Sequence, residues 1–328
     1  MLIDSFKRTH EYLRVSVTDR CNLRCVYCMP EEGFECLHHE DILRNEEFIE
    51  LISLFVNMGI KKIRFTGGEP LVRKGFIDIL ERTKEIAPDV ELAVTTNGVA
   101  LDNYIDDLYR LGVKKINISL DTLSKERFLR LTRRDYLSSV LENIDKVLEY
   151  NYFEVKLNAV LFDETLAELD DFISYCLKRN LTLRFIERMP FCEQEADNSF
   201  ISSDILLSEF AERGKLIRTE ENDSAVACSY DVVLPTGTIH IGIIPPISHK
   251  FCSVCNRLRL TADGLLKTCL LSSDEYNIKD CLRAGADENI LRAIIQKALG
   301  EKGAGHNLNP EHKNETVQSG RKMSSIGG

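Results

Sequence analysis

The chain has 328 residues, of which 44% are hydrophobic and 29% are charged, a balance that is typical of globular proteins and excludes extensive disorder. Its formal net charge of -10 disfavours a nucleic-acid-binding protein, because such proteins usually carry a basic surface. No stretch approaches the roughly 18 apolar residues of a membrane span, and the N-terminal residues are too polar for a signal peptide. We therefore expect a cytoplasmic protein that contacts neither membranes nor nucleic acids, although a few local Arg and Lys residues could still bind a small anion.

Short β-type segments alternate with helical segments over the first two thirds of the chain. Strands are predicted at residues 13–18, 62–66, 91–95, 114–120, 153–161 and 181–187. The segments between them have helical spacing; Phe48, Leu51, Ile52 and Phe55, for example, stand at positions i, i+3, i+4 and i+7. A last helix follows from about residue 203. Six strand–helix units predict an α/β fold with a parallel sheet, either open or curved into a partial (β/α)6 barrel, with functional residues at the carboxyl ends of the strands.

The alternation of predicted strands and helices ends after about residue 214, so we divide the chain into residues 1–214 and residues 215–328. Segments 231–234 and 238–243 flank Pro235-Thr236-Gly237 and are predicted to form a hairpin. A helix is predicted at residues 288–299. The segment from Glu301 onwards is polar and is expected to be a flexible tail.

The eleven cysteines are an odd number, so they cannot all pair in disulfides, and six of them fall into two groups. The first group is Cys21, Cys25 and Cys28, a C-x3-C-x2-C spacing directly after the first predicted strand. An iron–sulfur cubane normally has four thiolate ligands. Three thiolates could therefore hold such a cluster with one iron open to a ligand, and a structural zinc site with a distant fourth ligand is the alternative.

The second group is Cys252, Cys255 and Cys269, which would also suit zinc with His249 or a distant cysteine as the fourth ligand. Arg257 and Arg259 lie between its second and third cysteines; on a strand both side chains would face the same ligand, and Arg suits phosphate or purine contacts. The remaining cysteines have no motif partner and are interpreted as small buried hydrophobic residues: Cys36, Cys176, Cys192, Cys228 and Cys281.

The first cysteine group, with Tyr27 before its last cysteine, and Gly67-Gly68-Glu69-Pro70 at the end of the second strand resemble the signature of radical S-adenosylmethionine (SAM) enzymes. The similarity extends over nearly the whole chain. LRVSVTDRCNLRCVYCMP, KKIRFTGGEPLVR, TTNG, INISLDTL, RFIERMP, FCSVCNRLRL and a terminal Gly-Gly occur in the order that is found in the GTP 3′,8-cyclase family. The chain thus resembles that family, whose members are lyases with a partial TIM-like barrel and start molybdenum cofactor biosynthesis.

The resemblance implies that each cysteine group holds a [4Fe–4S] cluster, the first binding SAM and the second the guanine of GTP. The product would be 3′,8-cyclo-7,8-dihydro-GTP. SAM would be bound by Tyr27, Gly68, Ser119 and Met189. GTP would be bound by Arg14, Arg64, Thr95, Lys156, Arg257, Leu258 and Arg259. Arg257, Arg259, Gly327 and Gly328 would assist catalysis.

The resemblance also implies partners: an electron donor such as flavodoxin or ferredoxin, and the downstream cyclic pyranopterin monophosphate synthase. A homodimer is compatible with it. Two other hypotheses stay open from the residues alone. One is a radical SAM maturase that modifies peptides and has an auxiliary cluster, and the other is an electron carrier or zinc-stabilised interaction module. The zinc-stabilised module would leave the Gly-Gly-Glu-Pro motif unexplained.

Overall fold

The computed structural model describes residues 1–30, 32–33, 35–189, 191, 200–219, 226–306, 308, 321 and 323–327. Within this part of the chain, the predicted parallel strands form and pair with their neighbours in chain order. They are β1 (Tyr12–Ser16), β2 (Lys62–Thr66), β3 (Glu91–Thr96), β4 (Lys115–Ser119), β5 (Glu154–Val160) and β6 (Thr182–Ile186). The expectation of a parallel α/β sheet is therefore confirmed.

Later strands extend this sheet at both of its edges. At one edge, β10 (Arg257–Leu260) pairs parallel to β1, and β11 (Leu265–Lys267) and β12 (Tyr276–Asn277) continue antiparallel. At the other edge, β9 (Gly237–Ile244) pairs parallel to β6, and β8 (Cys228–Leu234) and β7 (Lys215–Arg218) follow antiparallel. The predicted hairpin is β8–β9, and the whole forms one continuous sheet.

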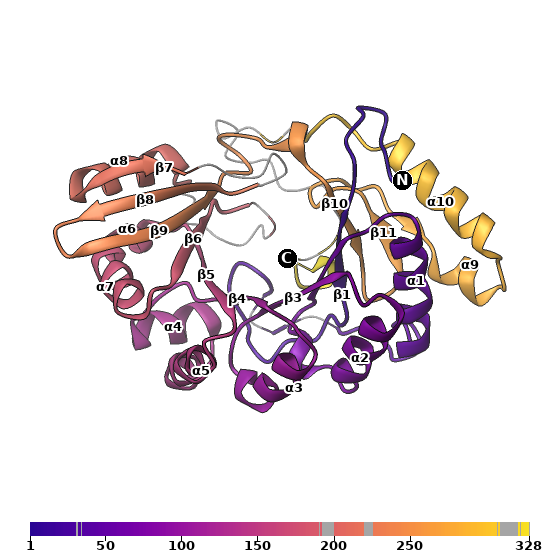
Figure 1. The fold of residues 1–328 in the computed structure, drawn as a ribbon, viewed down its shortest axis with the longest axis horizontal. Coiled ribbons are helices and arrows are strands. Elements are labelled where there is room, and N and C mark those ends of the chain that lie inside the picture. The colour runs from indigo at the N-terminus through magenta and orange to yellow at the C-terminus, as the bar shows by residue number, and fades with distance from the viewer. Residues whose placement is uncertain are drawn as a thin grey trace.

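Helices cover the convex face of the curved sheet, as Figure 1 shows for α1, α2, α3, α4, α5 and α7. Their bounds are α1 (Asn45–Asn57), α2 (Phe76–Ile86), α3 (Ile105–Arg110), α4 (Lys125–Thr132), α5 (Leu137–Glu149), α6 (Asp163–Ala167), α7 (Leu169–Arg179) and α8 (Ser203–Arg213). The C-terminal third adds α9 (Lys279–Arg283), α10 (Glu288–Gly300) and α11 (Met323–Ile326). The apolar stripe of α1 is fully buried against the sheet, as its 3.6-residue spacing predicts.

Alternate residues of the strands face opposite sides of the sheet. On β1 and β2, Leu13, Val15, Ile63 and Phe65 are completely buried towards the helices. The residues between them face the concave side and are polar, for example Arg14 and the residues at positions 62, 64 and 66. The sheet thus has an apolar outer face that holds the fold together and a polar inner face that is available to ligands.

The end of the chain lies on the concave side of the sheet (Figure 1). Ile326 at the end of α11 is 1% exposed, and Lys302 near the start of the predicted tail is 5% exposed. These two residues of the predicted tail are therefore buried, whereas the described residues 303–305 are exposed. Ile326 is an apolar anchor within a mostly polar segment.

Candidate functional site

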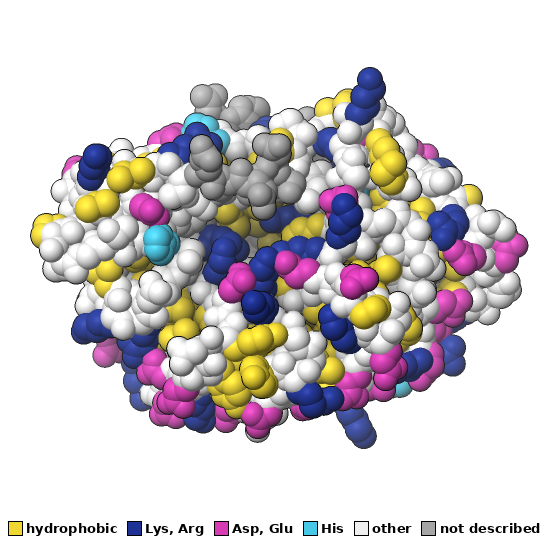
Figure 2. All heavy atoms as spheres, in the orientation of Figure 1, with side chains coloured by type: hydrophobic (Ala, Val, Ile, Leu, Met, Phe, Trp, Pro, Cys, Tyr) yellow, Lys and Arg dark blue, Asp and Glu magenta, His cyan; other side chains and the backbone are white. Residues whose placement is uncertain are grey.

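A cavity of about 1690 Å³ occupies the concave side of the sheet. Figure 2 shows it as a central hollow with several Lys and Arg side chains around it. Both cysteine groups line this cavity, together with the inward residues of β1, β2, β4, β5, β6 and β10. The two groups that are far apart in the sequence thus share one chamber.

The first cysteine group lies in the loop after β1, which is fixed by contacts to its own backbone. Arg24 Nη1 donates to the carbonyl oxygen of Cys21 at 2.6 Å, and Arg133 Nη1 donates to the carbonyl oxygens of Arg24 and Met29 at 3.0 Å each. Burial, assisted by Glu69, raises the pKa of Cys21 to about 11, and burial raises the pKa of Cys25 further. Thiols in this environment lose their protons readily only when a positively charged group stabilises the thiolate, and a metal centre provides that charge.

Gly67 and Gly68 lie directly against this loop. The amide of Gly68 donates to the carbonyl oxygen of Thr18 at 2.7 Å, and the amide of Glu69 donates to that of Arg20 at 2.8 Å. A Cβ on Gly68 would overlap the carbonyl of Arg20 and lie 2.6 Å from the carbonyl oxygen of Asp19. Only glycine therefore allows the end of β2 to approach the cysteine loop this closely.

The other residues predicted to bind SAM line the same cavity: Tyr27, Ser119 and Met189. Tyr27 donates its hydroxyl hydrogen to Asp121 Oδ2 at 2.6 Å, and Asp121 Oδ1 accepts the amide of Val160 at 2.8 Å. This fixes the ring of Tyr27 next to Cys28. The spacing of β4 explains Ser119, because inward residues on a strand recur every second position.

The second cysteine group forms another part of the cavity wall. Arg8 Nη1 donates to the carbonyl oxygen of Cys252 at 2.7 Å, and a Cβ on Gly305 would lie 3.3 Å from the sulfur of Cys252. His249, considered above as a zinc ligand, bonds instead to Asp204 at 2.8 Å and does not line the cavity. His249 is therefore not placed as a ligand of the second group.

The donor set fits iron–sulfur clusters. In the part of the chain that the structure describes, no three His, Cys, Asp or Glu residues are grouped to hold a single metal ion. The cysteines of a cubane bind different irons, so they lie farther apart than the ligands of one zinc ion. Of the remaining cysteines, Cys176 is buried as expected, but Cys36, Cys228 and Cys281 are partly exposed, and Cys192 lies outside the described residues.

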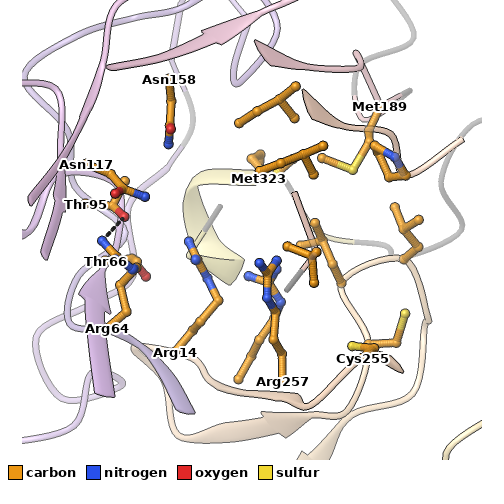
Figure 3. Close-up of a pocket in the computed structure, with 18 of the residues that line it drawn as sticks. Arg14, Arg64, Thr66, Thr95, Asn117, Asn158, Met189, Cys255, Arg257 and Met323 are labelled. Carbon is orange, nitrogen blue, oxygen red and sulfur yellow. Dashed lines mark hydrogen bonds between the residues drawn. The ribbon is translucent and has the colours of Figure 1, made fainter. Parts of the chain in front are cut away.

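Cationic side chains from separate strands converge on the cavity that both cysteine groups line. Arg14, Arg64, Lys156, Arg257 and Arg259 all line the cavity, and Figure 3 shows Arg14 and Arg257 pointing into it, with Arg64 and Thr95 on one wall. Arg64 donates to the carbonyl oxygen of Val94 at 2.7 Å and to the hydroxyl of Thr95 at 3.4 Å. Leu258 differs from the other residues predicted to bind GTP, because its side chain is completely buried in the core.

Tyr12 lies at the centre of this cationic layer. Arg64 Nε donates to its hydroxyl at 2.8 Å, and the guanidinium of Arg257 lies 5.6 Å from its ring centre. Burial raises the pKa of the phenol, but the charges of Arg64, Arg14, Arg257 and Lys62 outweigh it and lower the pKa to about 6. The hydroxyl and the ring of Tyr12 thus contact two of the arginines and help to hold them in place.

Sequence reasoning missed several other residues that line the cavity: Tyr12, Lys62, Lys115, Asn158 and Arg184. All lie on strands in the same alternation as the predicted residues, so the period of two was a usable signal. Glu91 bonds Lys62 at 2.5 Å and Lys115 at 2.6 Å, so these two lysines are already paired with a carboxylate.

The chain end reaches the cationic layer. The carbonyl oxygen of Gly327 accepts from Arg259 Nη1 at 2.5 Å and from Arg14 Nε at 3.3 Å. The φ angle of Gly327 is 74°, in the left-handed region, and a Cβ there would overlap the hydroxyl of Thr66. Gly328 lies outside the described residues. The structure thus brings together both cysteine groups, the predicted cations and Gly327.

Comparisons with known proteins agree with this arrangement. The family described as Radical SAM superfamily matches residues 15–176, and the family Molybdenum Cofactor Synthesis C matches residues 181–308. The GTP 3′,8-cyclase of Rhodococcus opacus is 39% identical over 330 residues, covering 100% of this chain and 93% of the relative. The GTP 3′,8-cyclase of Petrotoga mobilis is 40% identical over 332 residues and covers 100% of both chains.

The fold is also similar to that of a solved structure. SuiB from Streptococcus suis, bound to S-adenosylmethionine, superposes with a TM-score of 0.59 at 13% identity, covering 88% of this chain and 68% of that one. Among the described residues, none of the helices has the length and apolarity that crossing a membrane requires. From the full-length relatives, the chain belongs to the GTP 3′,8-cyclase family, radical SAM enzymes of molybdenum cofactor biosynthesis that use SAM and [4Fe–4S] clusters.

Proposed function

We propose that the shared cavity is the place where GTP is cyclised, with SAM at the first cysteine group and GTP between the second group and the cationic layer. The observation that carries this proposal is that both cysteine groups and the cations line one chamber. We propose that residues 1–214 supply the SAM end and residues 215–328 supply the second cluster and part of the GTP end. The product would be 3′,8-cyclo-7,8-dihydro-GTP.

At the SAM end, Cys21, Cys25 and Cys28 would hold one [4Fe–4S] cluster, and Tyr27, Gly68, Ser119 and Met189 would surround SAM. Once bound there, SAM and the reduced cluster supply one-electron chemistry that protein side chains cannot perform themselves. The contribution of Gly68 is space, because the absence of a Cβ leaves its backbone open beside the cysteine loop. Tyr27 contributes a ring fixed by its bond to Asp121.

At the GTP end, a triphosphate carries about four negative charges, so a protein with a net charge of -10 must concentrate cations locally to bind it. Arg14, Arg64 and Lys156 approach from three different strands and would, with Thr95, hold the nucleotide. Cys252, Cys255 and Cys269 would hold the second [4Fe–4S] cluster. Leu258 would contribute only backbone groups, because its side chain lies in the core.

Arg257 and Arg259 would act on the reacting nucleotide. The guanidinium of Arg257 lies between the rings of Tyr12 and Phe251, 5.6 Å and 6.0 Å from their centres, which limits its direction. Arg259 is directed by the carbonyl oxygen of Gly327. Gly327, and Gly328 after it, would therefore assist by orienting arginines at the substrate.

The proposal includes partners that the chemistry requires. A one-electron donor such as flavodoxin or ferredoxin would reduce the first cluster, and the product would pass to the cyclic pyranopterin monophosphate synthase. A homodimer and a cytoplasmic location belong to the same proposal. A reducing compartment agrees with the free thiols of the two cysteine groups.

The test is anaerobic incubation of the iron-loaded protein with SAM, dithionite and GTP, with the products identified by mass spectrometry. Cys21→Ala should abolish SAM cleavage. Arg257→Ala should leave most SAM cleavage intact while cyclisation falls at least tenfold. Arg292→Ala is the matched control, because Arg292 pairs with Glu288 on the exposed side of α10. Equal loss of both activities in Arg257→Ala would contradict its proposed role.

A further inference from the structure

Lys302, just beyond the end of α10, is a buried cation without an acidic partner. Its side chain lines the cavity, and the residue is 5% exposed. Its ammonium donates to the carbonyl oxygens of Thr268 and, at 3.4 Å, of Arg257. No carboxylate among the described residues forms an ion pair with it. A buried lysine normally requires a negative charge nearby, because carbonyl groups only partly replace water around an ammonium.

Asp4 is the carboxylate whose charge acts on Lys302, but it already has two other partners. Arg8 Nε donates to Asp4 Oδ2 at 2.6 Å, and His10 Nε2 lies 3.0 Å from the same oxygen. Burial and the charge of Lys302 lower the pKa of His10 to about 4, so this histidine is neutral at pH 7. The charges of Arg8 and Asp4 compensate each other, so Asp4 does not balance the charge of Lys302.

That charge faces the second cysteine group. Thr268, one of the two carbonyl partners, precedes Cys269 directly, and Arg257 follows Cys255 by two positions. Burial lowers the pKa of Lys302, whereas negative charge on Cys255 and Cys269 would raise it. Both carbonyl partners of Lys302 adjoin the second cysteine group, so an anion held by that group would compensate this buried ammonium.

We propose that Lys302 is the counter-charge of the second cysteine group, which stabilises its thiolate-bound cluster and makes that cluster easier to reduce. This inference rests on the proposed function, in which Cys252, Cys255 and Cys269 hold a [4Fe–4S] cluster. A cluster with thiolate ligands becomes more negative on reduction, so a fixed positive charge beside it raises the reduction potential. Because the same ammonium holds the carbonyl of Arg257, it also links the cluster to the side chain proposed to act on GTP.

Three substitutions separate the charge of Lys302 from its hydrogen bonds. Lys302→Arg retains both the positive charge and the hydrogen-bond donors. Lys302→Gln retains a hydrogen-bond donor without the charge. Lys302→Met retains neither, but its apolar side chain has a similar length and is suited to a buried position. Lys297→Gln on α10 is the matched control, since its side chain is 68% exposed. Each variant is prepared in the full chain and also in a full chain with Cys21, Cys25 and Cys28 replaced by Ala, so that only the second cluster is observed.

Two quantities are measured anaerobically: the midpoint potential of the second cluster, by titration with electron paramagnetic resonance detection, and the rate of iron loss to a chelator. We expect Lys302→Gln and Lys302→Met to have a more negative potential and to lose iron several-fold faster. Lys302→Arg and Lys297→Gln should stay close to the unsubstituted protein.

The inference is overturned if Lys302→Gln keeps the potential and the iron of the unsubstituted protein, whether or not Lys302→Met loses them, because hydrogen bonding would then be sufficient. If Lys302→Met does not fold, as judged by circular dichroism, the Gln and Arg variants still decide between charge and hydrogen bonding. A second group that binds zinc in the unsubstituted chain would overturn the proposed function as well. An iron-loaded second group with an unchanged potential in Lys302→Gln overturns this inference alone.

Discussion

Gly327→Ala tests whether the docked chain end is needed for cyclisation. An alanine at a φ of 74° costs about 1–2 kcal/mol relative to glycine, because its Cβ crowds the backbone in the left-handed region. The added Cβ would also overlap the hydroxyl of Thr66 and lie 3.1 Å from Cβ of Ser16. These neighbours belong to β2 and β1, whose backbones are fixed by their pairing, so overpacking adds about 1 kcal/mol or more.

A total of about 2 kcal/mol lowers the equilibrium constant for docking about thirtyfold, since each 1.36 kcal/mol is a factor of ten. We therefore expect cyclisation to fall about thirtyfold in Gly327→Ala, while SAM cleavage changes less than about twofold. Both products, 5′-deoxyadenosine and the cyclised nucleotide, are quantified in one anaerobic reaction by mass spectrometry. Gly300→Ala is the matched control, because a Cβ on Gly300 would meet no atom within 4 Å.

The reasoning is refuted if Gly327→Ala cyclises GTP within about threefold of Gly300→Ala. The carbonyl of Gly327 would then not be required at Arg259. A parallel loss of SAM cleavage would show instead that the substitution distorts the wall of the cavity formed by β1 and β2.

Three further perturbations follow from the same structure. Gly68→Ala places a Cβ against the carbonyls of Arg20 and Asp19, so SAM cleavage should fall at least tenfold in turnover assays, with less iron bound in elemental analysis. His10 has a folded-state pKa of about 4, below its ordinary 6.5, so stability should fall as the pH drops below 6.5. Its share is about 1.3 kcal/mol between pH 7 and pH 5.5, and His10→Asn should remove it in anaerobic urea unfolding. Arg321 bonds Asp263 and Glu275 at 2.7 Å each, so Arg321→Ala should release the chain end and lower cyclisation several-fold, with partial recovery in Arg321→Lys.

The central fold could be predicted because its residues alternate with regular periods. The strands at residues 62–66 and 91–95 match β2 and β3 to within one residue, and the helix at 288–299 matches α10 similarly. The edge strands β7, β11 and β12 were not predicted. They contain four, three and two residues, and such segments are too short to show the alternation of apolar and polar residues that indicates a strand.

The site could be predicted where a local motif carries the chemistry, as in the two cysteine groups. Contacts between distant parts of the chain had no such signal. Lys302 is one lysine after a helix, and its burial depends on carbonyls 34 and 45 residues away. The docking of Gly327 depends on Arg14, which is 313 residues earlier in the chain. Neither arrangement changes the local pattern of residues. A role for Gly327 was expected only from the family resemblance, and Lys302 was not singled out at all.

The distribution of charge in the cavity favours one end of it for the nucleotide that we propose it binds. Lys62 and Lys115 share the carboxylate of Glu91, whereas Arg257 and Arg259 have no carboxylate partner in the described part of the chain. Burial, together with the charges of Arg14 and Arg257, holds the pKa of Arg259 well below its ordinary value. A buried guanidinium beside other positive charges is stabilised strongly by a bound anion, because the anion compensates for the water that burial removed. The end of the cavity near β10 is therefore the part most strongly disposed to accept GTP, and the Gly327 carbonyl supplies partial negative charge there.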